Sequence, residues 1–273
     1  MIYFPNAKIN IGLYITEKRN DGFHNIESIF YPIPLCDVLE IIINDEKDTV
    51  FSSTGIDIPG SKEENLCVKA YELLRNDFKL PGLKIHLHKI IPIGAGLGGG
   101  SADTSFFINA VNELFGLNIS ASKIEKYALH LGSDCPFFIK NEPAFVTGRG
   151  EVFEKLELDL KGYYLVIINP GIHISTKEAY DGITVEKPKI SVKDFISNNT
   201  ISDWKGNIHN QFEDTIFSIY PKIGQIKNTL YDLGATYAAM SGSGSTVFGL
   251  FKTKPDFDFK SAYPEYFTWE KVI

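Results

Sequence analysis

A glycine-rich segment in the first half of the chain constrains its fold more than any other feature. Five of the seven residues from Gly94 to Gly100 are glycines, and only Ala95 and Leu97 interrupt them. Glycine adopts left-handed backbone conformations that other residues avoid, and it lets main-chain N–H groups approach a ligand closely. Ser101 follows at the predicted start of a helix, where unpaired N–H groups and the helix dipole favour an anion. The segment therefore predicts a phosphate-binding loop, whereas a single glycine pair would indicate only a flexible turn.

This loop does not match the three common phosphate-binding sequences. Gly94, Gly96 and Gly99 satisfy G-x-G-x-x-G, but a dinucleotide fold also needs an acidic residue about 20 positions further on, at the end of a strand. The carboxylate near that spacing is Glu113, which lies in a predicted helix. A P-loop would need a lysine before Ser101, and the H-R-D and D-F-G sequences of protein kinases are absent. We therefore expect a phosphate loop of another type.

Hydrophobic patterning places strands and helices on both sides of the loop. It predicts strands at residues 8–15, 37–44, 49–53, 83–87 and 163–168, and a strand, glycine-serine turn and strand over 235–251. It predicts helices at 63–78, 101–115 and 221–233, and another that begins at a Ser122–Glu125 capping box and ends at Gly132. The pattern restarts after Gly150, which predicts two domains, at residues 1–155 and 156–273.

Composition argues against several classes of partner and compartment. Lys and Arg number 27 against 34 Asp and Glu, a net charge of −7, which supplies no field to attract nucleic acid or an anionic membrane. The longest apolar run is far shorter than the about 20 residues that span a bilayer, and no signal peptide is visible. Cys36, Cys67 and Cys135 form no C-x-x-C pair, so neither disulfides nor a zinc cluster is expected. A cytoplasmic protein without nucleic-acid or membrane partners is predicted.

Three motifs, in order along the chain, resemble those of the GHMP small-molecule kinase superfamily. Residues 92–101, Pro-Ile-Gly-Ala-Gly-Leu-Gly-Gly-Gly-Ser, resemble its central motif, and residues 5–10 and 240–248 resemble its first and third motifs. Residues 19–30, 132–138 and 170–176 resemble the branch that phosphorylates a cytidine diphosphate-linked methylerythritol. Phe23 stands where that branch more often has tyrosine, and Ala102-Asp103 stands where a serine and an amide are common.

The resemblance implies a fold, an activity and a substrate. The fold is α/β, a two-domain α+β arrangement with an N-terminal half like the second domain of ribosomal protein S5, a ferredoxin-like C-terminal half and an active-site cleft between them. The activity is transfer of the ATP γ-phosphoryl group, with Mg²⁺, to the 2-hydroxyl of the methylerythritol unit, on the methylerythritol phosphate route to isoprenoid precursors. The partner is this small molecule, and the protein is expected to be a monomer or a weak homodimer.

The resemblance also assigns residues to the reaction. Asp134 corresponds to the catalytic base and Lys8 to its partner, an ammonium that keeps the carboxylate ionised and steadies the developing charge. No metal ligand is assigned. The residues expected to bind ATP are Asn65, Leu66, Lys89, Pro92, Gly94, Gly96, Leu97, Gly98, Gly99, Gly100, Ser101, Ala102 and Asp103.

Four residues are expected to bind the cytidine substrate. Phe23 and Tyr180 are candidates to stack on the base, although core packing explains Tyr180 equally well. His24 is expected to hydrogen-bond the base, and Asn10 to contact the erythritol hydroxyls. These roles rest on the matched segments.

Two other functions remain open at this stage. One is a GHMP kinase for mevalonate, homoserine or a sugar, which residues 19–30 disfavour. The other is a nucleotide-binding regulator without catalysis, which Lys8 and Asp134 disfavour. His86 and His88 share one strand face but lack a third metal ligand, so a surface pair is the better interpretation.

Overall fold

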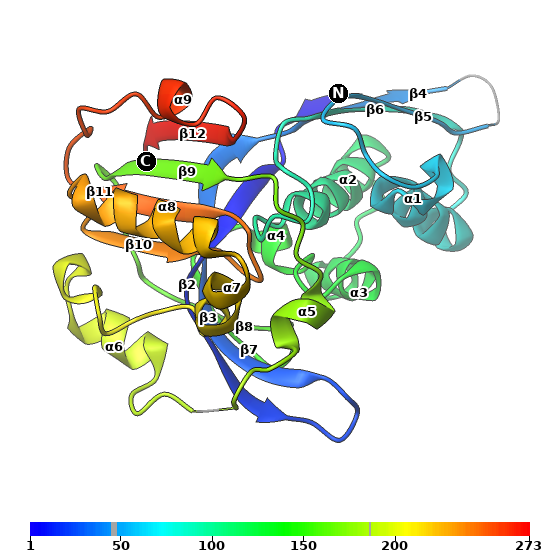
Figure 1. Ribbon diagram of the computed structural model, residues 1–273. Helices are drawn as coiled ribbons and strands as arrows, with labels where there is room; N and C mark the ends of the chain where they lie inside the picture. Colours follow the sequence, from blue (N-terminus) through cyan, green and yellow to red (C-terminus); the bar gives the residue numbers. More distant parts are fainter. Residues whose placement is uncertain (45–47, 186) are drawn as a thin grey trace. The chain divides into compact units, whose positions relative to one another are not determined.

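The computed structural model describes residues 1–44, 48–185 and 187–273, and these group into two compact units. Unit 1 comprises residues 1–7, 34–93 and 98–142, and unit 2 comprises residues 8–33, 94–97 and 143–273. Each unit collects segments from distant parts of the chain and combines helices with sheet, as the predicted α/β class requires (Figure 1). The boundary between two domains near residue 155, expected from the sequence, stays a prediction.

Unit 1 is a four-stranded sheet with helices packed on one face (Figure 1). Its strand order is β1 (Ile2–Tyr3), β4 (Val38–Ile43), β6 (Leu83–Lys89) and β5 (Val50–Gly55), with only β5 and β6 parallel. Leu83, Ile85 and Leu87 alternate with more exposed residues, so one face of β6 enters the core. The 3₁₀ turn η1 (Lys62–Glu64) precedes helices α1 (Leu66–Asp77), α2 (Gly99–Leu114), α3 (Ala121–Leu131) and α4 (Phe137–Lys140).

Unit 2 contains two four-stranded sheets in which the assigned strand pairs are antiparallel. One has the order β2 (Asn6–Lys18), β3 (His24–Cys36), β7 (Ala144–Thr147) and β8 (Val152–Lys155). The other has the order β10 (Tyr237–Met240), β11 (Val247–Phe251), β9 (Tyr164–Asn169) and β12 (Phe267–Val272). Its helical segments are α5 (Thr176–Tyr180), α6 (Val192–Asn198), η2 (Ile201–Asp203), α7 (Phe212–Ile219), α8 (Pro221–Asp232) and α9 (Phe259–Ala262).

The core of unit 2 explains why its second sheet forms where the sequence predicts strands. Every residue of β9 is buried, because the strand lies inside the sheet between β11 and β12. Ile223, Ile226 and Leu230 of α8 join the same core cluster as β9. Pro221 occupies the first turn of α8, as the sequence predicts, since proline has no N–H to lose there.

Two predicted helix starts are wrong in detail. The helix predicted at residues 63–78 begins later than expected, because the capping box of Ser61 and Glu64 starts only η1. Helix α1 follows with Asn65 as its N-cap, and the Asn65 side chain accepts a 2.9 Å hydrogen bond from Cys67 N. Likewise, Ser120 rather than Ser122 is the N-cap of α3. In both places more than one polar residue is able to cap, so the local sequence alone does not fix the first residue of the helix.

Among the described residues, no helix combines the length and the apolar character needed to cross a membrane.

Candidate active site

The glycine run adopts the backbone conformations that predict a ligand-binding loop. Gly94, Gly96 and Gly98 have φ angles of 63°, 77° and 71°, in the left-handed region that favours glycine. Gly98 is the N-cap of α2, so the helix begins inside the run, two residues before the predicted start at Ser101. The first N–H groups of a helix have no partner within it. The run thus presents main-chain donors at the positive end of a 16-residue helix.

In unit 2 the first part of the run is tied to the N-terminal and C-terminal motifs. Gly96 O accepts a 2.8 Å hydrogen bond from Ser241 Oγ, and Leu97 O accepts a 2.9 Å bond from Lys8 N. Ser241 Oγ also accepts a 3.1 Å bond from Asn10 N. The three motifs recognised in the sequence therefore meet at these five residues.

Lys8 is a buried cation with a fixed orientation. Its side chain is only 3% exposed, and Nζ donates a 2.5 Å hydrogen bond to Asn10 Oδ1. Nζ also lies 4.4 Å from the centroid of the Phe30 ring. Asn10 is held in turn, because its Nδ2 donates a 3.0 Å bond to Ser28 Oγ. Both groups of the Asn10 amide are thus engaged, and Asn10 orients the lysine.

In unit 1 the start of α2 contacts the segment that carries Asp134. Ser105 Oγ donates a 2.6 Å hydrogen bond to Cys135 O, and the Ser101 hydroxyl hydrogen-bonds the Cys135 thiol. Asp134 itself is partly exposed, and its carbonyl accepts a 3.2 Å bond from Phe137 N. The residue expected to act as base therefore lies next to a residue anchored on the predicted ATP helix.

The remaining predicted ATP residues differ in what they can offer a ligand. Leu97 and Ala102 are fully buried, so only their main chains are able to contact a nucleotide. Leu66 lies beside the start of α2, since a Cβ on Gly100 would be 3.8 Å from Leu66 Cδ1. The side chain of Asn65 is used as the cap of α1. Gly100 is exposed, and Pro92 is half-buried.

Lys89 and Asp103 form a buried ionic cluster with Asp37, which sequence reasoning missed. Lys89 Nζ pairs with Asp37 Oδ2 and, at 2.8 Å, with Asp103 Oδ2. The three residues are at most 3% exposed. Burial raises the pKa of the Asp103 carboxyl to about 7, because one ammonium does not compensate two buried carboxylates. The two carboxylates also raise the pKa of Lys89, against the opposing effect of burial.

The aromatic residues expected to bind the cytidine substrate lie in two separate contacts of unit 2. The rings of His24 and Tyr180 are stacked, with centroids 4.6 Å apart and an interplanar angle of 18°. Phe23 is 52% exposed, and the Arg149 guanidinium carbon lies 4.5 Å from its ring centroid. Tyr180 thus pairs with His24, and Phe23 pairs with Arg149. Arg149 is a further candidate for the substrate site, and the Gly-Arg-Gly sequence at residues 148–150 could have indicated it.

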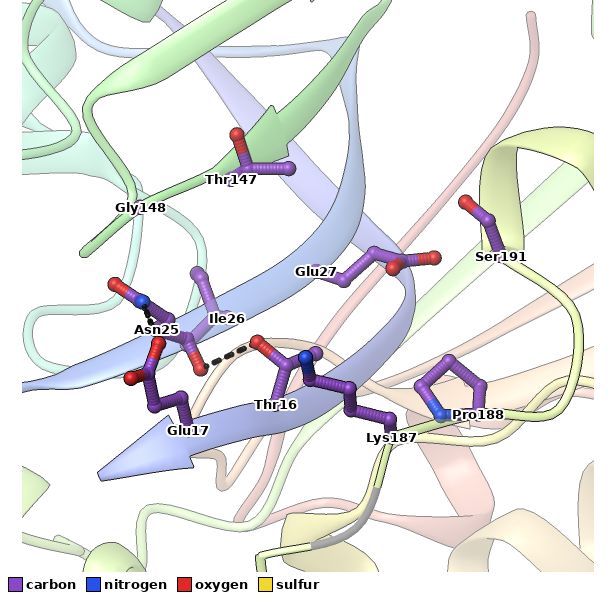
Figure 2. A pocket seen from close by; sticks show the side chains of 10 residues that line it. All are labelled: Thr16, Glu17, Asn25, Ile26, Glu27, Thr147, Gly148, Lys187, Pro188 and Ser191. Carbon is purple, nitrogen blue, oxygen red and sulfur yellow. Dashed lines mark hydrogen bonds between the residues drawn. The ribbon is translucent and has the colours of Figure 1, made fainter. Parts of the chain in front are cut away.

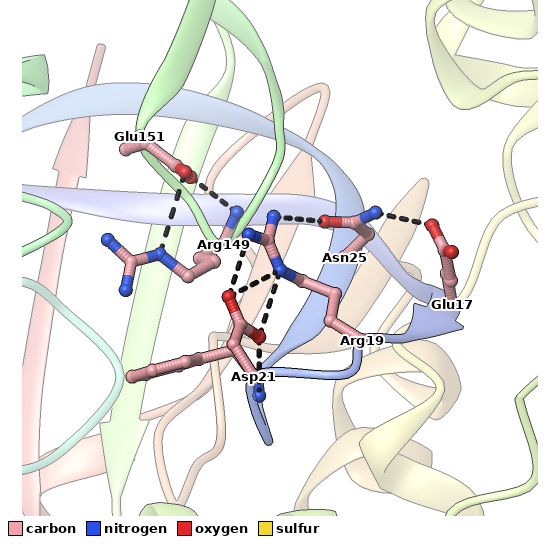
Figure 3. Close-up of polar contacts among 7 residues, drawn as sticks. Glu17, Arg19, Asp21, Asn25, Arg149 and Glu151 are labelled. Carbon is pink, nitrogen blue, oxygen red and sulfur yellow. Dashed lines mark hydrogen bonds and ion pairs between the residues drawn. The ribbon is translucent and has the colours of Figure 1, made fainter.

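Polar contacts hold the loop between β2 and β3, which carries Phe23 and leads into His24, the first residue of β3 (Figure 3). Arg19 forms hydrogen bonds of 3.1, 3.1 and 2.8 Å to the Asp21 carboxylate, and these bonds lower the pKa of Asp21. Asp21 Oδ1 also accepts a 3.1 Å bond from Phe23 N, and Arg19 Nη1 donates a 3.1 Å bond to Asn25 Oδ1. The matched Arg-x-Asp-Gly sequence therefore shapes this loop.

A pocket of about 390 Å³ lies beside this loop in unit 2 (Figure 2). Its lining is mostly polar and comes from β2, β3, the end of β7 and the segment before α6: Thr16, Glu17, Asn25, Ile26, Glu27, Thr147, Gly148, Lys187, Pro188 and Ser191. Asn10, Phe23, His24 and Tyr180 do not line it. The pocket is therefore adjacent to the predicted substrate residues in sequence but is not formed by them.

The histidine pair of β6 and the cysteine next to Asp134 both have hydrogen-bond partners in the structure. His86 hydrogen-bonds Ser52 and Thr54 at 2.9 and 3.0 Å, and His88 hydrogen-bonds Thr54 at 2.9 Å. Burial raises the pKa of the Cys135 thiol to about 11, so this residue stays protonated near neutral pH and is a poor nucleophile. No cluster of three His, Cys, Asp or Glu side chains suited to a metal occurs in residues 1–44, 48–185 and 187–273.

Comparison with protein-family models identifies both halves of the chain. Residues 65–142 match the GHMP kinases N-terminal domain, and residues 192–266 match the GHMP kinases C-terminal domain. The first match includes the central glycine motif, the ionic cluster residues Lys89 and Asp103, and Asp134.

Curated relatives match nearly the whole chain. The 4-diphosphocytidyl-2-C-methyl-D-erythritol kinase of Parabacteroides distasonis is 50% identical over 270 residues, which cover 99% of this chain and 98% of the relative. The enzyme of the same name from Bacteroides fragilis is 52% identical, with 94% of this chain and 96% of the relative covered.

Solved structures agree with these matches. A crystal structure of 4-(cytidine 5'-diphospho)-2C-methyl-D-erythritol kinase superposes with a TM-score of 0.82 at 28% identity, covering 99% of this chain and 98% of that one. The Methanococcus jannaschii mevalonate kinase superposes with a TM-score of 0.72 at 16% identity, covering 99% and 97%, a likeness of fold alone. The chain therefore belongs to the GHMP kinases, and within them to the 4-diphosphocytidyl-2-C-methyl-D-erythritol kinase family.

Proposed function

We propose that this kinase transfers the γ-phosphoryl group of ATP to the 2-hydroxyl of 4-diphosphocytidyl-2-C-methyl-D-erythritol, on the methylerythritol phosphate route to isoprenoid precursors. The observation that carries the proposal is the match of nearly the entire chain to relatives that bear this name. The internally hydrogen-bonded loop from Arg19 to Asn25 supports it further, because the segment that marks this branch of the superfamily has a defined shape here.

In this proposal Asp134 accepts the proton of the 2-hydroxyl as the oxygen attacks the γ-phosphorus. The new P–O bond forms while the bond to the β,γ-bridging oxygen breaks, and ADP leaves with that oxygen. Lys8 stabilises the negative charge on the transferring group. The burial of Lys8 and its bond to Asn10 support this role, because an ammonium that is already oriented needs little reorganisation during the reaction.

The main-chain N–H groups of residues 98–101 hold the triphosphate. Their position at the start of α2, in a run where Gly94, Gly96 and Gly98 have positive φ, supports this role. Mg²⁺ would enter as part of the ATP complex, and no residue of this chain is assigned to hold it. As part of that substrate, the ion neutralises phosphate charge.

His24 and Tyr180 bind the cytosine, and the Phe23 ring offers a further surface on which the base stacks. The existing stack of His24 on Tyr180 supports the first two, because flat rings already face one another there. Asn10 binds the erythritol hydroxyls only if it exchanges one of its present bonds to Lys8 and Ser28. We expect the protein to work in the cytoplasm as a monomer or weak homodimer, without nucleic-acid or membrane partners.

The decisive assay measures ADP release with 4-diphosphocytidyl-2-C-methyl-D-erythritol, mevalonate, homoserine and galactose in parallel. The proposal predicts release with the first alone. Release with another acceptor identifies a different GHMP kinase activity, and release with none supports a regulator. The Asp134→Asn variant should lose at least about 100-fold in kcat while ATP still binds, since general-base catalysis contributes roughly 10²–10⁴. An active variant would refute the base assignment.

A further inference from the structure

The buried cluster of Asp37, Lys89 and Asp103 connects the start of β4, the end of β6 and the first turns of α2 in unit 1. Asp37 is the single residue between β3 and β4, Lys89 is the last residue of β6, and Asp103 lies in the early part of α2. The Lys89 ammonium contacts both carboxylates. The cluster therefore ties the strand that precedes the glycine run to the helix that follows it.

The same cluster holds main-chain positions at both ends of the glycine run. Asp37 Oδ1 accepts hydrogen bonds from Ile90 N at 2.6 Å and Ile91 N at 2.8 Å, where the chain enters the run. At the exit, a Cβ on Gly99 would lie 2.9 Å from Lys89 Nζ and 2.9 Å from Ile91 Cγ2. The ammonium thus packs directly against the first residue of α2, in the space that any side chain there would need.

Stability alone does not explain why this position is ionic. Three ionisable side chains are removed from water, and replacing a buried ion pair with apolar residues of similar volume is often neutral or stabilising. Asp103 Oδ1 is buried and has no hydrogen-bond partner among the described residues, which adds to the cost. What an apolar group cannot supply is directional bonding from one carboxylate to two consecutive N–H groups and to an ammonium under Gly99.

We propose that Asp37, Lys89 and Asp103 are positioning residues that fix the phosphate loop, with Lys89 acting through Gly99 on the N–H groups at the start of α2. This inference rests on the proposed function, because it needs those N–H groups to bind the triphosphate. It gives Lys89 a role under the phosphates in place of a contact with adenine. It also adds Asp37, to which the family motifs assign no role.

The test compares binding of inorganic tripolyphosphate and of adenosine, measured by calorimetry, in the wild type, Asp37→Asn and Lys89→Met. Tripolyphosphate carries the phosphates without the nucleoside, and adenosine carries the nucleoside without phosphates. Misplacing the loop should weaken tripolyphosphate binding at least about 10-fold and lower kcat/KM for ATP by a similar factor, because small errors in positioning cost about 100-fold. Adenosine affinity and the KM for the cytidine substrate should stay within about twofold of the wild type.

Tyr71→Phe is the matched control for a general loss of stability. It removes a partly buried 2.8 Å hydrogen bond from Tyr71 Oη to Pro81 O in the same unit. The melting temperatures of all variants allow each loss of tripolyphosphate affinity to be compared with the loss of stability. The control should keep its tripolyphosphate affinity. The double variant Asp37→Asn/Lys89→Met should bind tripolyphosphate no more weakly than the poorer single variant, since the two residues act as a unit.

Three results would overturn the inference. The first is a Lys89→Met variant that loses adenosine but keeps tripolyphosphate, which would return Lys89 to the nucleoside. The second is an equal loss in Tyr71→Phe, and the third is a wild type that does not bind tripolyphosphate. A wild type that phosphorylates a different acceptor would refute the proposed substrate instead, while the tripolyphosphate comparison would still support the positioning role.

Discussion

Replacing Gly96 with alanine creates a severe steric conflict in the glycine run. An alanine Cβ would lie 1.9 Å from Ser241 O and 2.7 Å from Ser241 C, and Gly96 has a φ of +77°. Both contacted atoms belong to the main chain, so no side-chain rotation relieves the overlap. The loop or the segment after β10 must move instead, and the hydrogen bond from Ser241 Oγ to Gly96 O would be strained.

Two terms set the size of the effect. A non-glycine residue in a left-handed conformation costs about 1–2 kcal/mol, and relief of an overpacked contact costs about 1–3 kcal/mol or more. Their sum, about 2–5 kcal/mol, corresponds to a fall of about 5–15 °C in melting temperature for a chain of this size. Because the lost geometry belongs to the proposed phosphate loop, the KM for ATP should rise as well.

The matched control is Gly100→Ala, four residues further on. A Cβ there meets nothing closer than Leu66 Cδ1 at 3.8 Å, and Gly100 lies within α2. Alanine in a helix is favoured over glycine by about 1 kcal/mol, so this variant should melt at or above the wild-type temperature. Circular dichroism melts of the three proteins measure the difference. A Gly96→Ala melting point within about 2 °C of the wild type, or an equal loss in Gly100→Ala, would refute the steric argument.

Three further outcomes follow from the structure. Burial raises the folded-state pKa of Asp103 to about 7, so the contribution of this carboxyl to stability is full below pH 4 and is lost as pH rises through 7, at about 1.4 kcal/mol per pH unit. Denaturant titrations should show that the free energy of unfolding depends less on pH in Asp103→Asn than in the wild type. An unchanged dependence on pH would contradict this. Tyr180→Leu should raise the KM for the cytidine substrate about 10-fold or more without changing the KM for ATP, whereas Tyr180→Phe keeps the ring and should stay near the wild type; equal effects on both substrates would argue for core packing. Iodoacetamide should label the half-buried Cys36 before the buried Cys67 and Cys135, and mass spectrometry measures the order of labelling. Early labelling of Cys135 would contradict the high pKa of its thiol.

The elements that the sequence predicts well are those with strong local signals. Alternating leucine and isoleucine give β6, the continuous apolar run gives β9, and Pro221 gives the start of α8. Strand β3 is not predicted because Pro32 and Pro34 lie within it, and proline usually marks an edge or the end of a strand. Its pairing with β2 and β7 supplies what the local sequence does not.

The site follows the same division between local and tertiary information. The phosphate loop is visible in the sequence because glycine spacing itself encodes the backbone. Asp37 is not, because the sequence shows it only as the first residue of a predicted strand, and only the fold brings it to Lys89 and to the N–H groups of Ile90 and Ile91. The stack of His24 on Tyr180 joins residues 156 positions apart (180 − 24), a distance over which no periodicity acts.

The most direct test of the central claim is ³¹P NMR of the wild-type protein incubated with ATP, Mg²⁺ and 4-diphosphocytidyl-2-C-methyl-D-erythritol. The account predicts that the γ-phosphate resonance of ATP is replaced by one phosphomonoester resonance coupled to the substrate, with the diphosphate of the cytidyl group intact. Formation of ADP with inorganic phosphate alone, or no loss of ATP, would contradict it.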